Sequence, residues 1–296
     1  MTRIHTPEYI QKFRQIIQDT YGYEMYMDFL IVPSLTSKPT LSYLPFINYT
    51  DRTSDSIEDL QKLAKESNYL IRTLNPQYTS YKDNDPVTMR IAIESNKSED
   101  LMMILKSRCR NKVRKSHKNY NYTLREGKEC IEDFYTIVSQ TYYRHGTPML
   151  KKELFYNMQK NLQDDIIFFV VYDENNRPAA AMSTCIDGKL ACFPWGGVEE
   201  SYTKKFAGYF LYFEIIKRVT QKFDIEVFDL GRSPYNGPTY KFKSQFGATP
   251  IKIDLIKPHA EDIYNKYSLA SNIWKKLPRF FVDRLGPNLT KYLADL

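Results

Sequence analysis

The clearest pattern of apolar and polar positions lies between residues 130 and 256. Apolar runs of strand length alternate there with polar turns, and Asp187-Gly188-Lys189 joins two of the runs as a hairpin turn. The pattern predicts two helices at 130–143 and 152–162, followed by three strands at 166–172, 179–186 and 190–195. A helix at 206–222, a strand at 225–230, a short helical turn at 241–246 and a last strand at 250–256 complete the predicted order. The helix at 206–222 is apolar nearly all round, which is typical of a helix packed on a sheet. This order predicts an α/β unit.

The first half of the chain contains both helix-like and strand-like patterns of apolar positions. Its predicted elements are a helix, a strand, an apolar loop, a capped helix and two strands, at 7–19, 28–32, 44–49, 56–67, 69–72 and 87–93. The chain carries no internal repeat and no low-complexity linker. The fold class is therefore a mixed-sheet α/β protein, with room for more than one unit in 296 residues.

A helix predicted at 98–118 has an apolar arc on one face and cations around the rest. Leu101, Leu105, Cys109 and Val113 recur every four residues, so they fall in one arc of about 120° on a helical wheel. Two basic rows flank the arc, formed by Lys106, Arg110 and Arg114 and by Arg108, Lys112 and Lys115. A charge run of this kind is usually a solvated surface. The alternative is a phosphate-binding edge, because the guanidinium fork meets phosphate oxygens bidentately.

Composition narrows the class of protein and of partner. The chain is 42% hydrophobic and 26% charged, which is globular, and its net charge of +7 is compatible either with an ordinary surface or with an anionic partner. None of the four cysteines forms a C-x-x-C pair, so we expect no zinc site, and we expect Cys185 and Cys192 to be core thiols. The first residues are polar and no apolar run reaches about 20 residues, so we expect no signal peptide and no transmembrane segment. We expect a cytoplasmic location, with peripheral attachment to the inner face of a membrane as the alternative.

The tail mixes large apolar side chains with cations. The apolar positions are Ile273, Trp274, Leu277, Phe280, Phe281 and Leu285, and the cations between them are Lys275, Lys276, Arg279 and Arg284. This pattern predicts either a tail that packs back on the first half or one that lies on an anionic membrane.

Five short motifs occur in the order found in Fem-type aminoacyl transferases and their shorter FemAB-like and BioF2-like relatives. They are Leu-Pro-Phe-Ile-Asn-Tyr ending at Tyr49, Arg-Asn-Lys-Val-Arg-Lys at 110–115, Gly-Thr-Pro at 146–148, Phe-Asp-Leu-Gly-Arg-Ser at 228–233, and Tyr-Lys-Phe-Lys at 240–243 with Phe-Gly-Ala at 246–248. The chain resembles this group of acyltransferases over nearly its whole length from residue 28. The long coiled-coil arm of the larger Fem enzymes has no counterpart here, since no sustained heptad run exists.

The resemblance implies two tandem GNAT-like domains, with the second better preserved. We expect a first domain at 1–120, a catalytic domain at 121–258 and a helical tail at 259–296 that packs back on the first domain. The activity implied is transfer of an acyl or aminoacyl group to an amine of a cell-envelope precursor, such as an amino sugar or a peptide.

The resemblance places Lys243 at the reaction centre, where an ammonium would hold the donor and stabilise a developing oxyanion. Asp229 is the second catalytic candidate. It could accept the amine proton or form an ion pair with Arg232 or Lys241; alternatively an Asp–Arg pair simply stabilises the turn. The strand end at which these residues lie is where α/β sheets bind ligands. The expected substrate-binding residues are Arg232, Ser233, Tyr240, Lys241, Arg110, Arg114, Tyr49 and His145.

The acyl donor stays open between aminoacyl-tRNA, an acyl carrier protein and acyl-CoA. The stretch Lys204-Lys205-Phe206-Ala207-Gly208-Tyr209-Phe210 has one glycine of the usual pyrophosphate loop and lacks its second small residue, which argues against coenzyme A. We expect a phosphate-bearing donor or acceptor as partner. The alternative functions are a coenzyme-A-dependent N-acetyltransferase and a non-enzymatic RNA- or anion-binding protein on the same fold.

Overall fold

The structure is a computed structural model that describes residues 5–35, 38–50, 58, 62, 69–93, 101–257 and 268–293. Its described residues form two compact units that interleave along the chain. Unit 1 contains residues 76–141 and 162–252, and unit 2 contains 5–75, 142–161 and 253–296. The sequence predicted domains that follow one another along the chain, with boundaries at 120 and 258, and this division stays a prediction. The helix expected at 56–67 lies outside the described residues.

Unit 1 is built on one mixed sheet. Its strands run in the order β12-β5-β11-β9-β8-β7-β6, and β10 pairs with β8 beside β9. All neighbours are antiparallel except β11 and β9, which are parallel. The strands are β5 (Pro86–Ala92), β6 (Thr123–Glu126), β7 (Ile166–Tyr172), β8 (Pro178–Asp187), β9 (Leu190–Cys192), β10 (Gly196–Val198), β11 (Val227–Pro234) and β12 (Thr249–Ile256). The mixed α/β class expected from sequence is confirmed.

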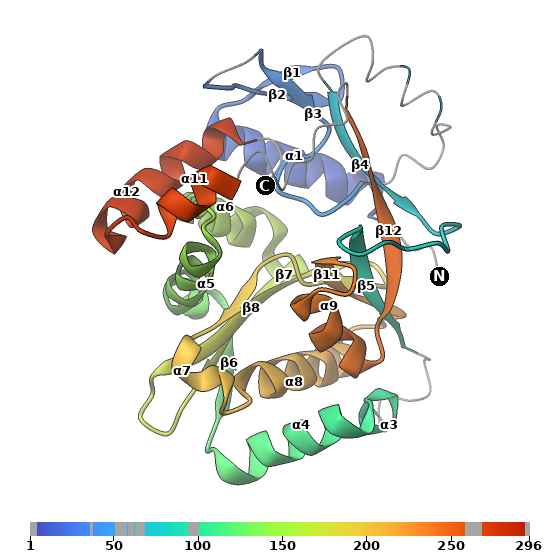
Figure 1. Ribbon diagram of the computed structural model, residues 1–296, viewed down its shortest axis with the longest axis vertical. Coiled ribbons are helices and arrows are strands. Elements are labelled where there is room, and N and C mark those ends of the chain that lie inside the picture. Colours follow the sequence, from blue (N-terminus) through green and yellow to red (C-terminus); the bar gives the residue numbers. More distant parts are fainter. Residues whose placement is uncertain are drawn as a thin grey trace. The chain divides into compact units, whose positions relative to one another are not determined.

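Successive side chains of β7 point to opposite faces of the sheet, and each face is covered by a helix. Ile167, Phe169 and Val171 belong to the apolar core that includes helix α8 (Ala207–Lys222). Phe168 points to the opposite face, where its ring meets Phe134 of α5 (Ile131–His145) at a centroid distance of 5.0 Å. Both faces of the strand are thus buried, which explains why β7 is an unbroken apolar run. Figure 1 shows α8 lying along one face of this sheet.

The remaining helical elements of unit 1 flank this sheet. They are α3 (Leu101–Ile104), α4 (Ser107–Asn119), η2 (Lys128–Cys130), η3 (Gln163–Asp165), α7 (Glu200–Thr203), α9 (Pro238–Lys243) and η4 (Ser244–Phe246). The helix expected at 98–118 is divided at Leu105 and Lys106, and its positions before Leu101 lie outside the described part. The backbone of Lys106 is extended, with ψ 148°, and its N–H donates to the carbonyl of Gln245 at 2.9 Å. The apolar arc is nevertheless correct, because all four of its residues are buried in the core cluster that includes α8.

Unit 2 combines helix α1 with a small mixed sheet. Thr6 caps α1 by accepting the N–H of Tyr9 at 3.2 Å, and Gly22 ends the helix in the left-handed conformation. Phe29, Tyr69, Ile71 and Ile256 form a core cluster of the sheet. The elements are α1 (Pro7–Tyr21), β1 (Glu24–Tyr26), β2 (Phe29–Val32), β3 (Thr40–Ser42), β4 (Tyr69–Asn75), the end of β12, α6 (Lys152–Leu162), α11 (Ser268–Trp274), α12 (Arg279–Leu289) and η5 (Thr290–Tyr292).

The tail is helical where the structure describes it, and it meets the amino-terminal region within unit 2. The hydroxyl of Tyr23 donates to the carbonyl of Lys291 at 2.9 Å. The Gly-Thr-Pro loop at 146–148 packs against helix α11. A Cβ on Gly146 would lie 2.1 Å from Ser271 Oγ, so only glycine lets α11 approach this loop.

Candidate active site

A β-bulge in β11 organises the motif that carries the resemblance. Asp229 pairs with Arg90 of β5 and Arg232 pairs with Thr88, so the two residues Leu230 and Gly231 lie opposite a single residue of β5. Gly231 has a φ of +82°, which favours glycine. The strand therefore continues to Pro234, whereas the sequence predicted that it would end at Leu230.

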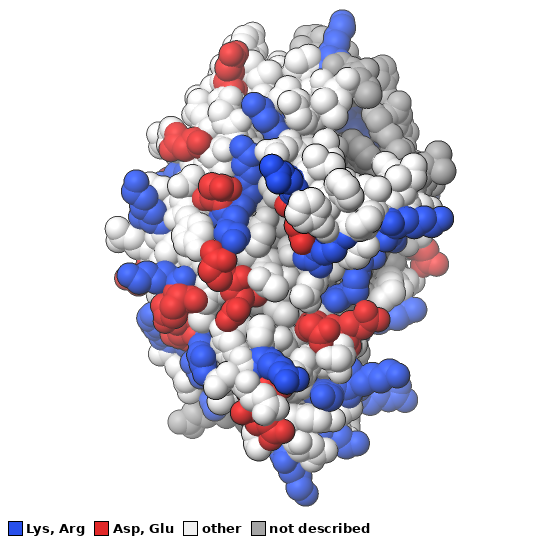
Figure 2. Space-filling view, turned by 90° about the vertical axis from the view of Figure 1, so that its left-hand side faces the viewer, with Lys and Arg blue, Asp and Glu red and all other residues white. Residues whose placement is uncertain are grey.

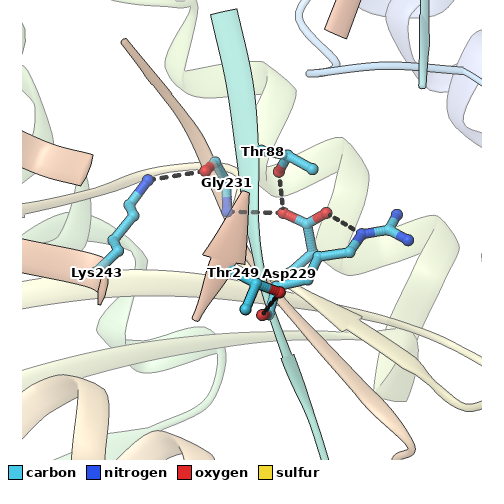
Figure 3. A network of polar contacts seen from close by, with 6 residues as sticks. Thr88, Asp229, Gly231, Lys243 and Thr249 are labelled. Atoms are coloured by element: carbon cyan, nitrogen blue, oxygen red, sulfur yellow. Dashed lines mark hydrogen bonds and ion pairs between the residues drawn. The ribbon is translucent and has the colours of Figure 1, made fainter. Parts of the chain in front are cut away.

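The carboxylate of Asp229 stabilises the bulge. Its Oδ1 accepts hydrogen bonds from Thr88 Oγ1 at 2.5 Å and from the Gly231 N–H at 2.8 Å, and its Oδ2 accepts from Arg90 Nε at 2.9 Å. Figure 3 shows Thr88 of β5 and the Gly231 N–H of β11 meeting the carboxylate. Asp229 is 0% and Arg90 1% exposed, so the ion pair is shielded from water.

Lys243 reaches the same bulge from α9. Its Nζ donates to the carbonyl oxygens of Gly231 and Arg232, each at 2.9 Å. Burial lowers the pKa of Lys243 to about 7; the nearby Asp229 carboxylate opposes this shift, and the Arg232 charge adds to it. A buried amine held by two carbonyls can exist as a neutral base or as an ammonium near pH 7.

The two forms of Lys243 offer different chemistry at one point. A neutral amine uses both N–H groups on the two carbonyls and leaves its lone pair to accept a proton. An ammonium has a third N–H that can donate to an oxyanion. Lys243 is 7% exposed, so it is largely buried but retains some contact with solvent.

The structure brings several predicted site residues together around this bulge. Arg232 and Lys241 are exposed, and Tyr240 is half-buried. Ser233 is 1% exposed, and its hydroxyl has no hydrogen-bond partner among the described residues. The side chains of Arg232 and Lys241 are thus the accessible charges, while Ser233 is part of the buried strand.

Aromatic rings pack beside Tyr240. Its ring lies 4.8 Å from that of Tyr235, which in turn stacks on Tyr81 at 4.9 Å. Burial raises the pKa of Tyr240 and of Tyr81, so both hydroxyls are neutral at physiological pH. Tyr240 lies one helical turn before Lys243 on α9, so the cluster could line a substrate.

The four other predicted residues belong to other segments of the chain. Arg114 is exposed on α4, and Arg110 donates to the Met102 carbonyl at 3.5 Å. Tyr49 is only 2% exposed in unit 2, where its ring lies 5.9 Å from His5. His145 is also in unit 2, where its carbonyl accepts from Ser271 Oγ at 3.1 Å; burial lowers the pKa of its imidazole, and Arg144 and Lys275 lower it further. A binding role for these four residues stays a prediction.

Sequence reasoning missed Thr88 and Arg90, which bind Asp229. The available signal was their alternation as polar residues within the apolar run 87–93. Cys185 and Cys192 are buried and free, as expected of core thiols, and they face each other across β8 and β9. Within the described part of the chain, no group of three or more His, Cys, Asp or Glu residues is placed to hold a metal ion.

Charge does not gather into one basic field on the face drawn in Figure 2. Lysine and arginine side chains are interspersed there with aspartate and glutamate. None of the described helices combines the length and apolar character that a bilayer crossing requires.

Comparison with known proteins connects this geometry to a family. Residues 106–244 match the family model of the acetyltransferase (GNAT) domain. No curated protein matches the sequence. Solved structures share the fold at low sequence identity. FemX has a TM-score of 0.54 and 12% identity, over 82% of this chain and 86% of its own.

Two further structures extend over most of the chain. L-PGS from Bacillus licheniformis has a TM-score of 0.52 and 10% identity, over 93% of this chain and 99% of its own. The C-terminal domain of a putative lysylphosphatidylglycerol synthetase from Agrobacterium fabrum has a TM-score of 0.52 and 10% identity, over 90% of this chain and 94% of its own. The family match and the shared fold agree with the motifs, and residues 106–244 form a GNAT-type acyltransferase domain.

Proposed function

We propose that this protein transfers an acyl or aminoacyl group from a tRNA- or carrier-linked donor to an amine of a cell-envelope precursor, with Lys243 as the proton-transfer residue. The observation that carries the proposal is the buried Lys243 amine, held by two carbonyls and with a pKa lowered to about 7. A group whose pKa lies near the working pH transfers protons most effectively.

The acceptor nitrogen attacks the donor carbonyl carbon, and the C=O electron pair moves onto oxygen. Neutral Lys243 takes the proton that the nitrogen must lose. Collapse of the tetrahedral intermediate breaks the bond from carbonyl carbon to the carrier oxygen or sulfur, and Lys243 returns the proton to that leaving group. One amide forms, one ester or thioester breaks, and the lysine ends neutral.

Asp229 has a positioning role in this proposal. Its oxygens accept from Thr88, Arg90 and Gly231, so it holds the bulge whose carbonyls orient Lys243. The exposed Arg232 and Lys241 are the candidates for holding a phosphate of the donor or acceptor. Aminoacyl transfer is favoured by the motifs that resemble those of Fem-type enzymes and by the similar fold of a putative lysylphosphatidylglycerol synthetase.

The test is a reconstituted transfer assay. Purified protein is given total tRNA charged with radiolabelled amino acids, or labelled acetyl-CoA, together with an extract of envelope precursors that contains amino sugars and peptides. We expect label from aminoacyl-tRNA in an alkali-stable amide. Lys243→Ala should lower this transfer by about 10²–10⁴-fold. Lys128→Ala, an exposed lysine of η2, is the matched control and should not change it. Full activity of Lys243→Ala would overturn the assignment.

A coenzyme-A-dependent N-acetyltransferase is the second candidate, because the matching family model is that of an acetyltransferase domain. Against it stands Phe206, a bulky residue at φ +62° just before α8, where a small residue of the pyrophosphate loop would be expected. Calorimetric titration with acetyl-CoA separates the candidates. Micromolar binding together with transfer only from acetyl-CoA would replace the first proposal by the second. Failure of every donor, combined with salt-sensitive RNA binding, would favour a non-enzymatic protein.

A further inference from the structure

Four large apolar side chains of α11 and α12 face solvent. Ile273 is 63%, Phe280 69%, Phe281 53% and Leu285 47% exposed, and we call this set the α11–α12 patch. The two phenylalanine rings meet edge to face at 5.7 Å. Single exposed apolar residues are ordinary, but four of them on one helical hairpin mark an interaction surface.

The amphipathic layout of α12 shows that the patch is an outward face. Val282 and Gly286 form the buried side of the helix, four residues apart. Gly286 lets the helix pack closely, because a Cβ there would lie 3.3 Å from Met149 N and 3.4 Å from the Trp274 ring. At about 100° per residue, Phe280, Phe281, Arg284 and Leu285 share the opposite arc. The apolar exposure is therefore not an unsatisfied packing face of unit 2.

Charge within the described stretch 268–293, which contains the patch, is almost entirely positive. Lys275, Lys276 and Arg284 are exposed, and Arg284 lies on the same arc as the phenylalanines. Asp283 is the only acidic residue in the described stretch 268–293, and Arg279 pairs with it at 2.7 Å. A face that combines exposed rings with exposed cations complements a surface that is anionic outside and apolar beneath.

Tyr143 holds the hairpin that presents this face. Its hydroxyl lies 3.0 Å from the Lys275 carbonyl and 2.9 Å from the Leu277 carbonyl, both in the turn between the helices. The Arg279 guanidinium lies 5.5 Å from the centre of the Tyr143 ring. The patch is thus presented by an ordered turn, which limits the entropy lost when it binds a surface.

We propose that the α11–α12 patch docks the protein on an anionic lipid bilayer. The phenylalanine and leucine side chains would enter the boundary between headgroups and acyl chains, while Lys275, Lys276 and Arg284 would lie at the level of the lipid phosphates. A second copy of the chain is a poorer occupant, because three exposed cations on each copy would be brought together.

The experiment is co-sedimentation of the purified full chain with vesicles. One set contains phosphatidylglycerol mixed with phosphatidylcholine, and the other contains phosphatidylcholine alone. We expect pelleting with the anionic vesicles, and less in high salt. Removing the paired rings in Phe280→Ser/Phe281→Ser should weaken binding at least about tenfold. Lys276→Ala/Arg284→Ala should weaken it by about fivefold per charge. Met103→Ser, which removes an exposed apolar side chain of α3, is the matched control and should bind like the wild type.

Three outcomes would overturn the proposal. They are no pelleting of the wild type, pelleting that is equal for Phe280→Ser/Phe281→Ser, and a dimer in analytical ultracentrifugation that this variant abolishes while vesicles do not bind. Circular dichroism of each variant checks that it folds. The test needs no substrate and no turnover, so its failure would leave the proposed transfer reaction untouched, and failure of the transfer assay would leave lipid binding untouched.

Discussion

Lys243 Nζ lies 2.9 Å from the carbonyl oxygen of Gly231, the residue at which β11 bulges. This contact joins the two motifs that carry the resemblance, one from the end of a strand and one from a short helix. The bulge turns backbone carbonyls toward the amine, and burial favours its neutral form. A proton-transfer site thus follows from an irregularity in a sheet.

The pH dependence of the reaction should follow Lys243. If the neutral amine accepts the proton, kcat/KM rises as the pH increases through about 7 and then levels off. Initial rates from pH 5.5 to 9 at low substrate concentration measure this profile, and Lys243→Ala should lose the inflection. A rate that instead falls through the same pH range would show that the ammonium is the active form, acting on the oxyanion.

Lys243→Met should be inactive and more stable than the wild type. The pKa of Lys243 is about 7 in the folded chain against 10.5 when exposed, so the unfolded chain binds more protons between these values. Wild-type stability therefore rises with pH across that window. Methionine removes the buried amine and should raise the free energy of unfolding by about 1 kcal/mol at pH 7. Urea unfolding at pH 7 and pH 9.5 measures both values; a stabilisation that does not shrink at the higher pH would contradict this account.

Asp229→Asn should destabilise the protein strongly. The amide can still accept from Gly231, but it removes the negative charge opposite the buried Arg90. Loss of one partner of a buried ion pair costs about 3–5 kcal/mol. Thr88→Val removes a single hydrogen bond to the same carboxylate and should cost only about 1 kcal/mol. Chemical denaturation measures the free energy of unfolding of both variants. Equal losses of stability would contradict the larger contribution assigned to the Arg90–Asp229 ion pair.

His117 should make the packing of α4 on α8 sensitive to pH. One ring nitrogen lies 2.8 Å from the Val113 carbonyl and the other 2.8 Å from Glu214, so both face acceptors and the ring is best satisfied as imidazolium. The hydrogen bond to Glu214 raises the pKa of His117, against the effects of burial and of Lys217, and the bond to His117 lowers the pKa of Glu214. Phe210 and Phe213 cover the ring.

The directions of the two pKa shifts define the pH range in which the His117–Glu214 pair stabilises the fold. The His117 contribution is complete below its unfolded pKa of 6.5 and is lost as the pH rises through its raised folded pKa. The Glu214 contribution is complete above 4.5 and is lost as the pH falls through its lowered folded pKa. The pair should thus add about 0.5 kcal/mol between these pH values, since its side chains are partly exposed. Urea unfolding from pH 4 to 9 should show this maximum for the wild type and a flatter profile for His117→Ala.

The sequence by itself determined the local elements, since these depend on periodicity. The apolar run at 166–172, the all-apolar helix at 206–222 and the arc from Leu101 to Val113 appear in the structure as strand, helix and buried face. Contiguous motifs likewise indicated the acyltransferase class, because their residues lie close together in the chain.

Only the tertiary structure decided which distant residues meet. Arg90 and Asp229 are 139 positions apart, and nothing local in either segment encodes their pairing. The division of the predicted helix at Lys106 depends on a hydrogen bond to Gln245, which no helical periodicity records. The bulge at Gly231 depends on the register between β5 and β11. Register and long-range pairing are settled by the packing of whole strands, so the environment that lowers the pKa of Lys243 exists only in the assembled sheet.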